Sequence, residues 1–241
     1  MKSEHRSPRA VHTHVLIAVK ELRLAKSRLA ESLSADDRTD LVVAMLHDTL
    51  ATLVGAGVGP GPDDPFSGIT VVTPDPTVAT IADLYGVRHL PDPARVHSGE
   101  SSLNAALAAA EASVPTDPDL TDLVALQADL PALSADELLE ALAAARKVGR
   151  AIVVDHTGTG TAALFACGPG SALDPRFGTN SAAHHIASGA HRLDGDWPGL
   201  RQDVDTVADL AAAAQLSLGP ATRAALEHMG CTPGVRQSRS G

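Results

Sequence analysis

The sequence predicts a three-layer α/β fold in which a mainly parallel sheet is covered by helices on both faces. Two observations support this prediction: short β-branched runs alternate with Ala- and Leu-rich stretches, and hydroxyl-x-x-acid signals begin several of those stretches. Strands that alternate with helices form parallel sheets, because each helix carries the chain back across one face of the sheet. The length of 241 residues and the hydrophobic content of 44% fit one ordinary globular domain.

The elements follow one another in a regular order. Short apolar runs predict strands over residues 15–19, 69–73, 87–90, 123–127, 151–155 and 162–166. Ala- and Leu-rich stretches predict helices over residues 35–53, 78–85, 103–112, 135–145, 181–188 and 207–215. N-terminal capping pairs support three of these helices: Ser34 with Asp37, Ser134 with Glu137, and Thr206 with Asp209. The Gly-, Pro- and Asp-rich residues 55–68 predict a surface loop before the second strand.

The two ends of the chain differ in composition from the middle. Residues 1–13 are polar and basic, and residues 231–241 are rich in Ser, Gly and Arg. We therefore expect a single domain over residues 14–230 with a flexible tail at each end.

Composition and charge exclude several classes of function. Aromatic residues make up 2% of the chain and its formal net charge is −10, so we expect no nucleic-acid partner. Residues 1–10 lack an apolar signal core and residues 15–19 are too short to cross a bilayer, so we expect no membrane association. Cys167 and Cys231 are too few for a disulfide scaffold, which favours a reduced, cytoplasmic location.

Three cations follow the first predicted strand. In doubly covered sheets, ligands bind beyond the carboxyl ends of the strands, so the residues after each strand are candidates for the site. Lys20, Lys26 and Arg28 could together bind a triphosphate in an otherwise acidic protein. The alternative is an ordinary solvated loop; the clustering favours function.

One carboxylate follows the fourth predicted strand, and two more lie near the C-terminal end of the chain. Asp129 ends an apolar strand, and Asp203 and Asp205 are separated by one residue, so an extended backbone points them the same way. Mg²⁺ prefers such hard oxygen ligands and keeps several waters and phosphates. Alternatively, Asp129 caps a turn and Asp205 or Thr206 caps the following helix.

Two further segments carry polar groups that suit anions. The glycines and threonines of residues 158–161 could direct N–H groups at an anion, although a hairpin turn explains them equally well and is favoured. Ser181 stands where a helix begins and could bind a carboxylate or serve as an N-cap. His184 and His185 are adjacent, so a helix directs them to different sides, and surface or packing roles are favoured over joint metal binding.

These pieces, in this order, resemble the family of 2-phospho-L-lactate and phosphoenolpyruvate guanylyltransferases of coenzyme F-420 biosynthesis. The resemblance runs from Val15 to about His228. The stretches that carry it are AVK at 18–20, AKSRL at 25–29, VTPD at 72–75, SLNAAL at 102–107, QADLPAL at 127–133, GTGT at 158–161, RFGTNS at 176–181 and WPGLRQDVDT at 197–206. Each stretch alone is weak, whereas the ordered set is specific.

The resemblance implies a GT-A-like nucleotidyltransferase fold, that of the nucleotide-diphospho-sugar transferases, and a role for each site residue. Asp129 and Asp203 would hold Mg²⁺, with Asp205 beside them. Lys20, Lys26 and Arg28 would bind the nucleotide phosphates and act in catalysis. Thr161, Gly178 and Ser181 would bind the acid substrate, the first two through their backbone. Thr73, Pro74 and Asn104 would contact the guanine and ribose.

The implied reaction condenses GTP with phosphoenolpyruvate to give enolpyruvoyl-2-diphospho-5'-guanosine and pyrophosphate. The same chemistry on 2-phospho-L-lactate or 3-phosphoglycerate stays open, and the product would pass to a deazaflavin-modifying transferase. More distant alternatives are a metal-dependent GT-A glycosyltransferase and a non-catalytic nucleotide-binding module. The chain departs from the wider superfamily in lacking a glycine-rich loop after the first strand, and it has Ala128 where relatives often have glycine.

Overall fold

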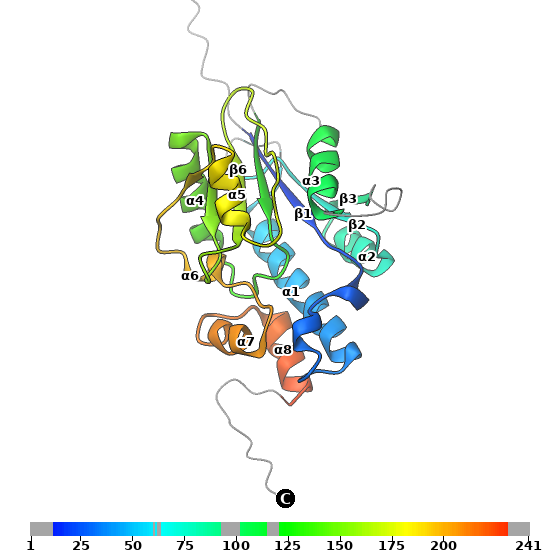
Figure 1. The fold of residues 1–241 in the computed structure, drawn as a ribbon. Coiled ribbons are helices and arrows are strands. Elements are labelled where there is room, and N and C mark those ends of the chain that lie inside the picture. Colours follow the sequence, from blue (N-terminus) through cyan, green and yellow to red (C-terminus); the bar gives the residue numbers. More distant parts are fainter. Residues whose placement is uncertain (1–11, 60, 62–63, 93–101, 115–120, 231–241) are drawn as a thin grey trace, which may run out of the picture.

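The computed structural model describes residues 12–59, 61, 64–92, 102–114 and 121–230 (Figure 1). Residues 1–11 and 231–241, which make up most of the two predicted tails, lie outside the described residues. Residues 12 and 13, which were predicted to belong to the first tail, are part of the first strand. The strands are β1 (His12–Ala18), β2 (Gly68–Thr73), β3 (Arg88–Pro91), β4 (Thr121–Leu126), β5 (Arg150–Val154), β6 (Thr161–Ala166) and β7 (His191–Arg192).

These strands form one seven-stranded sheet in the order β3-β2-β1-β4-β6-β5-β7. Neighbours are parallel from β3 to β4, β6 is antiparallel to both β4 and β5, and β7 is parallel to β5. The mainly parallel sheet predicted from the sequence is confirmed. The carboxyl ends of β1 and β4 therefore meet at one edge of the sheet, and the segments that follow them lie close together.

A tight hairpin explains why β6 runs against its neighbours. Only residues 155–160 join β5 to β6, and a connection this short cannot carry the chain across the sheet to a parallel position. Gly158 turns the chain at φ +76°, and the Asp155 carboxylate accepts from the backbone N–H groups of Thr159 (3.1 Å) and Gly160 (3.0 Å). These N–H groups already bind an anion of the chain itself, so the hairpin interpretation of this segment is confirmed.

The helices cover both faces of the sheet. They are α1 (Ala35–Ala56), α2 (Pro76–Leu84), α3 (Ser102–Ser113), α4 (Ala135–Val148), α5 (Ser181–Ala187), α6 (Pro198–Arg201), α7 (Val207–Ala213) and α8 (Pro220–His228). Successive strand residues point to opposite faces. Thus Val15 and Ile17 pack in a core with α1, α2 and α4, whereas Leu16 packs in a second core with α3 and α5. The three predicted layers are confirmed.

Several elements were not predicted, namely the short helices η1 (Leu22–Leu24) and η2 (Ser27–Leu29), β7, α6 and α8. The predicted capping box of Ser34 and Asp37 is confirmed, as is that of Thr206 and Asp209. The predicted capping pair of Ser134 and Glu137 is wrong.

Glu137 has a different partner because α6 lies against the start of α4. Its carboxylate accepts from the backbone N–H groups of Gly199 (3.3 Å) and Leu200 (2.7 Å), and Ser134 makes no side-chain capping bond. A carboxylate near exposed helical N–H groups is stabilised by them, and α6 supplies such groups from a distant part of the sequence. The two helices are thereby joined.

The long helix α1 passes a length-and-composition test for crossing a membrane. It has 22 residues, its most apolar 18-residue window has a mean hydropathy of 1.2, and half of that window is buried within the protein. Core helices of globular proteins pass the same test, and Leu41, Met45 and Leu50 are fully buried in the main core. This helix is therefore weak evidence for a membrane span.

A buried carboxylate on α1 caps the unpredicted helix α8. Asp48 is 5% exposed, and its two oxygens accept from the N–H groups of Ala221 (2.9 Å) and Thr222 (2.8 Å). We expect Asp48→Ala to lower the free energy of unfolding by about 2–3 kcal/mol, because two buried donors lose their acceptor. Urea unfolding checks this, with the exposed Asp40→Ala on the same helix as the control. Equal stability of both variants would contradict the capping role.

A buried histidine makes stability depend on pH. The His14 ring contacts the Thr70 hydroxyl at 2.8 Å, and burial, assisted by the charge of Arg88, lowers the pKa of His14 from 6.5 to about 4. Between these two values the unfolded chain binds a proton that the folded chain does not, so stability is lost as pH falls from about 6.5 to about 4. We expect a loss on the order of 2–3 kcal/mol. Melting curves across this range check it, and His14→Gln should make the dependence less steep. His185, whose pKa burial also lowers to about 4, accounts for part of what remains. An equally steep curve for His14→Gln would assign the loss elsewhere.

Candidate functional site

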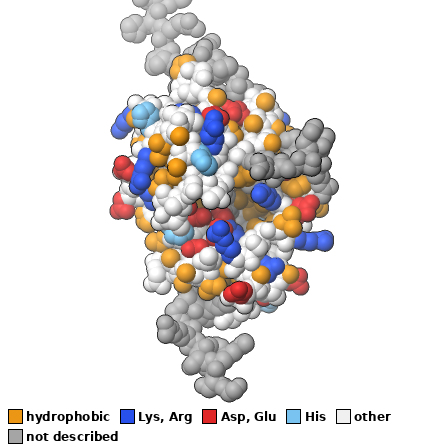
Figure 2. All heavy atoms as spheres, viewed as in Figure 1, with side chains coloured by type: hydrophobic (Ala, Val, Ile, Leu, Met, Phe, Trp, Pro, Cys, Tyr) orange, Lys and Arg blue, Asp and Glu red, His pale blue; other side chains and the backbone are white. Residues whose placement is uncertain are grey.

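A cavity of about 420 Å³ opens at the carboxyl ends of β1 and β4. It is lined by most of the predicted site residues: Lys20, Lys26, Asp129, Thr161, Gly178, Ser181, Asp203 and Asp205. All of the predicted metal ligands and all of the predicted acid-substrate residues thus meet in one place. Figure 2 shows basic and acidic side chains lying next to one another near the centre of this face.

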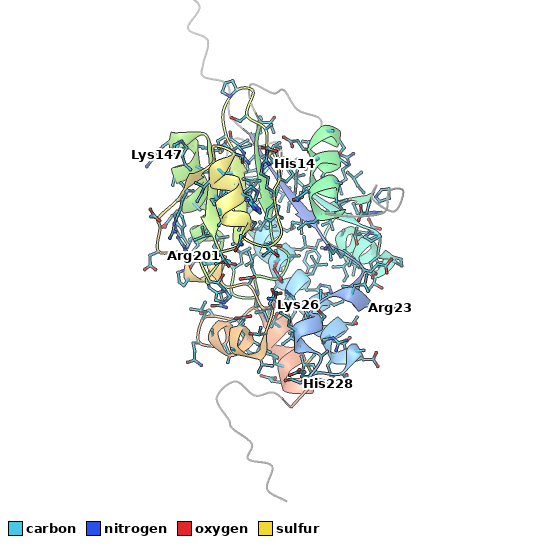
Figure 3. All side chains as sticks on the ribbon, viewed as in Figure 1. His14, Arg23, Lys26, Lys147, Arg201 and His228 are labelled. Carbon is cyan, nitrogen blue, oxygen red and sulfur yellow. The ribbon has the colours of Figure 1, made fainter. Side chains whose placement is uncertain are left out.

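Lys26 reaches into the cavity from the loop between η1 and η2. Its side chain is 7% exposed, and Nζ forms ion pairs with Asp129 Oδ2 and, at 2.9 Å, with Asp205 Oδ1. Figure 3 shows where Lys26 lies in the molecule. Burial alone would lower the pKa of Lys26, but the charges of Asp129 and Asp205 and the hydrogen bonds to both outweigh it and raise that pKa. The solvated-loop interpretation is therefore wrong for Lys26, whose ammonium is charged and held between two carboxylates.

The other two predicted cations lie at the mouth of the cavity. Arg28 has a side chain that is 74% exposed and stands 3.5 Å from Asp205 Oδ2, and Lys20 is exposed. An exposed ion pair of this kind contributes little to stability. Both side chains are therefore free to turn toward an anionic ligand at little cost.

Two carboxylates in the cavity are incompletely neutralised. Asp129 Oδ1 is buried and has no hydrogen-bond partner in the part of the chain that the structure describes. Burial raises the pKa of Asp203 to about 6, and the charge of Asp129 adds to the rise, against the opposing hydrogen bond from His156. A buried oxygen without a partner is costly, and a bound cation would relieve both residues.

These carboxylates fit a divalent cation through their oxygen chemistry, though they form no complete cage. Within the described residues, no group of three or more His, Cys, Asp or Glu side chains is arranged to hold a metal ion. Mg²⁺ needs no such cage, because waters and substrate phosphates complete its ligand set. The residues present therefore fit a cation that binds together with a nucleotide.

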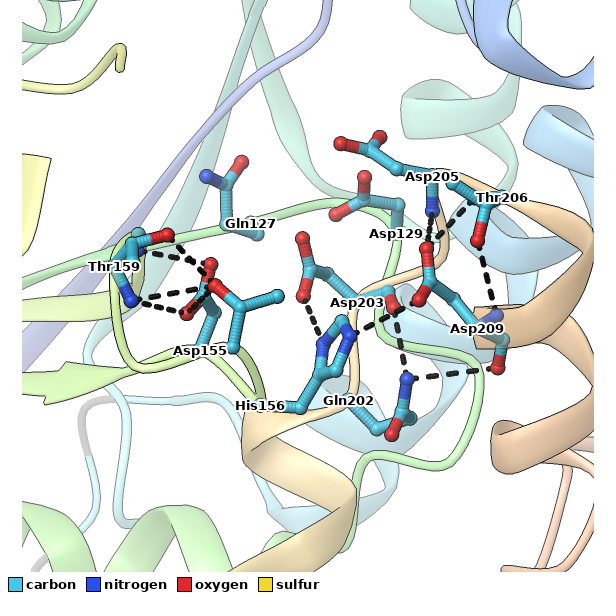
Figure 4. A network of polar contacts seen from close by, with 12 residues as sticks. Gln127, Asp129, Asp155, His156, Thr159, Gln202, Asp203, Asp205, Thr206 and Asp209 are labelled. Atoms are coloured by element: carbon cyan, nitrogen blue, oxygen red, sulfur yellow. Dashed lines mark hydrogen bonds and ion pairs between the residues drawn. The ribbon is translucent and has the colours of Figure 1, made fainter. Parts of the chain in front are cut away.

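His156 was not predicted and holds Asp203 in place. Its ring lies between two carboxylates, with Nδ1 2.9 Å from Asp203 Oδ1 and Nε2 3.0 Å from Asp209 Oδ1 (Figure 4). Burial lowers the pKa of His156, but its bonds to Asp203 and the nearby negative charges give a net rise. Because 47 residues separate His156 from Asp203, no local pattern in the sequence could have revealed the contact.

Thr161 and Ser181 are neighbours in the lining of the cavity. Both are buried, and Ser181 Oγ donates to Thr161 Oγ1 at 3.1 Å. Asn180 precedes α5 as its N-cap residue, so the alternative interpretation of Ser181 as an N-cap is wrong. Gly178 has φ +133°, a backbone conformation that side chains strongly disfavour, which explains glycine at this position.

The residues predicted to contact guanine and ribose, Thr73, Pro74 and Asn104, are not among those that line this cavity. Asn104 Nδ2 donates to the Phe177 carbonyl (3.0 Å) and its Oδ1 accepts from the Phe177 N–H (2.8 Å), so the amide supports the loop before Gly178. Thr73 is buried and accepts from the Asp75 N–H, while Pro74 borders a separate cavity of about 280 Å³. Their contact with guanine and ribose stays a prediction.

Comparison of the sequence with known proteins finds a family and close relatives. Residues 13–194 match the family described as "Guanylyl transferase CofC like". A protein of Rhodococcus erythropolis named phosphoenolpyruvate guanylyltransferase is 55% identical, over 91% of this chain and 98% of its own. A protein of the same name from Nocardia farcinica is 52% identical, over 92% and 93%.

Comparison of the structure with solved structures finds the same fold at low sequence identity. A nucleotide-diphospho-sugar transferase from Desulfovibrio desulfuricans G20 gives a TM-score of 0.64 at 16% identity, over 90% of this chain and 95% of that chain. A CMP:2-keto-3-deoxy-manno-octonic acid synthetase gives 0.50 at 13% identity, over 83% and 95%. The predicted nucleotide-diphospho-sugar transferase fold is confirmed.

Proposed function

We propose a specific reaction for this chain, which belongs to the family of CofC-like guanylyl transferases. The chain is a guanylyltransferase, and in the proposed reaction it transfers GMP from GTP to phosphoenolpyruvate, as in coenzyme F-420 biosynthesis. The name shared by relatives that are 55% and 52% identical supports phosphoenolpyruvate as the acid. The observation that carries the proposal is one cavity that brings Lys26, two incompletely neutralised carboxylates and the Thr161–Ser181 pair together.

In the proposed step, a phosphate oxygen of phosphoenolpyruvate attacks the α-phosphorus of GTP. A new P–O bond forms the diphosphate of the product, the bond between the α-phosphorus and its bridging oxygen breaks, and pyrophosphate leaves with the electron pair. The attacking oxygen is already anionic, so the step needs no general base. Catalysis then consists of positioning two anions and neutralising their charge, which Lys20, Lys26 and Arg28 can do.

Asp129 and Asp203 would hold Mg²⁺ in this proposal, with Asp205 beside them. The unpartnered oxygen of Asp129 and the raised pKa of Asp203 support a divalent cation. When bound, the cation would supply charge neutralisation at the triphosphate. The chain's own contribution is to orient these carboxylates, through His156 for Asp203 and through Lys26 for Asp129 and Asp205.

The acid pocket, which we define as Thr161, Gly178 and Ser181, would receive phosphoenolpyruvate. It offers hydroxyl groups and a backbone segment of unusual conformation in the same cavity as the carboxylates. The proposal also includes a cytoplasmic location and transfer of the product to a deazaflavin-modifying transferase, which the family membership supports.

The test is pyrophosphate release from GTP with each of three acids, coupled to a deazaflavin-accepting transferase that traps the product. We expect phosphoenolpyruvate to give the highest kcat/KM, above 2-phospho-L-lactate and 3-phosphoglycerate. ATP in place of GTP is the nucleotide control. Binding of GTP without pyrophosphate release from any acid would replace the proposal with a nucleotide-binding module.

A further inference from the structure

A histidine that the proposed reaction does not use lies directly behind the acid pocket. His185 belongs to α5, which packs against β5 (Figure 1), and its side chain is fully buried. Its Nε2 is 2.8 Å from the backbone N of Arg176, and its Nδ1 is 3.0 Å from Thr161 Oγ1. The ring thus joins the two segments that form the acid pocket, the start of β6 and the loop that leads to Gly178.

The partner of Nε2 fixes the tautomer of the ring. A backbone N–H can only donate, so Nε2 must accept and carries no proton. In the neutral ring the proton is then on Nδ1, which donates to Thr161 Oγ1. Burial, assisted by the charge of Arg150, lowers the pKa of His185 to about 4, so the ring is neutral at neutral pH.

This tautomer decides whether the Thr161 hydroxyl donates or accepts a hydrogen bond to a ligand. Thr161 Oγ1 receives one hydrogen bond from His185 Nδ1 and a second from Ser181 Oγ, which together occupy its two lone pairs. The hydroxyl can therefore only donate its own hydrogen. Since Thr161 lines the cavity that holds Asp129 and Asp203, the acceptor that suits this hydrogen is an anionic oxygen of a ligand.

The other nitrogen of the ring holds the loop before Gly178. The Arg176 N–H is bonded to His185, and the next residue, Phe177, is bonded through both backbone groups to Asn104. The Phe177 ring also packs edge-on against the His185 ring at 5.1 Å between centroids. Gly178 follows directly, so its backbone position depends on His185 and Asn104 together.

We propose that His185 is a positioning residue for the acid substrate, which holds the Thr161 hydroxyl as a donor to a substrate anionic oxygen and holds the backbone that leads to Gly178. This inference rests on the proposed function. It also gives Thr161 a role through its side chain, beyond the backbone contact that the family resemblance implies.

Two conservative variants test the two hydrogen bonds of the His185 ring separately. In His185→Asn the side-chain amide can replace Nδ1 as a donor to Thr161 but cannot reach Arg176. In His185→Gln the amide oxygen can replace Nε2 as the acceptor for Arg176, while the donor to Thr161 is lost. His184→Gln is the matched control, because His184 is the adjacent residue of α5 and is exposed.

We expect both His185 variants to raise the KM for phosphoenolpyruvate by about tenfold, the effect of losing one oriented hydrogen bond, with kcat and the KM for GTP changed less than about twofold. His184→Gln should match the wild type. A packing role alone predicts lower melting temperatures with an unchanged KM for phosphoenolpyruvate, and that result would overturn the inference. A wild-type protein that releases no pyrophosphate with phosphoenolpyruvate would instead overturn the proposed function and the inference together.

A measurement on the wild-type protein keeps the inference testable if a variant fails to fold. The ¹⁵N chemical shifts of the His185 ring distinguish a protonated Nδ1 from a protonated Nε2. We expect the Nδ1–H tautomer and no change in these shifts between pH 8 and about 6, since the ring stays neutral there. A ring protonated at Nε2 could not accept from Arg176, and the proposed orientation of Thr161 would then be wrong.

Discussion

Asp129→Asn and Asp203→Asn are each expected to lower kcat/KM by at least about 10²-fold while the protein stays folded. Each substitution removes a negative charge from the cavity in which a cation would bind with the triphosphate, and it keeps the size of the side chain. Pyrophosphate release at limiting and at saturating Mg²⁺ checks the result. Partial recovery at saturating Mg²⁺ is expected if these residues act through the metal.

Stability provides the control for this prediction. The raised pKa of Asp203 means that its ionised form is disfavoured in the folded protein, so Asp203→Asn should leave the melting temperature unchanged or raise it. Asp194→Asn, at an exposed carboxylate that pairs with the nearby Arg192, should affect neither activity nor stability. Near wild-type activity of either site variant at limiting Mg²⁺ would show that the residue in question is not a ligand.

The positions of the site carboxylates could be predicted, but on two different grounds. Asp129 follows an apolar strand closely, which places it at the carboxyl edge of a parallel sheet. Asp203 and Asp205 needed more, because no strand precedes them; their order relative to the other motifs identified them through the family resemblance. The structure then brought all three into the same cavity.

The supporting residues could not be predicted because their partners are far away in the sequence. His156, His185 and Asp48 each act on segments that only the folded chain brings near. A histidine gives no local signal of such a role, and eleven histidines are scattered along the chain. Asn104 differs from these residues: the family resemblance predicted a nucleotide contact for it, and in the structure its amide is bonded to the backbone of Phe177. The nucleotide contact stays a prediction.

In the fold as well, the elements that depend on local sequence patterns were predicted, and those that depend on contacts between distant residues were not. Alternating strand and helix patterns predicted the sheet, because burial on two faces requires those patterns. The helix α8 was missed because the acceptor that caps it lies on α1, and the reversal of β6 follows from a short loop whose N–H groups bind Asp155. Long-range polar contacts of this kind decide details that periodicity alone leaves open.

Lys26→Met is expected to lower kcat/KM for GTP by about 10²-fold and to lower the melting temperature as well. Methionine keeps most of the length of the side chain but removes the charge. In the free protein the ammonium compensates Asp129 and Asp205, so its loss leaves Asp129 without this cation and Asp205 paired with the exposed Arg28. During turnover the same charge would be missing beside the triphosphate.

A metal titration separates these two effects of Lys26. Because the ammonium stands between the carboxylates that would bind a cation, its removal should let the ligand-free protein bind Mn²⁺ or Mg²⁺ more tightly, even as turnover falls. Melting temperature against metal concentration measures this, since a ligand that binds only the folded state raises its stability. Lys147→Met, an exposed lysine at the end of α4 that lies away from the cavity in Figure 3, is the matched control. An unchanged kcat/KM for GTP together with a lowered melting temperature would make Lys26 a structural ion-pair partner alone.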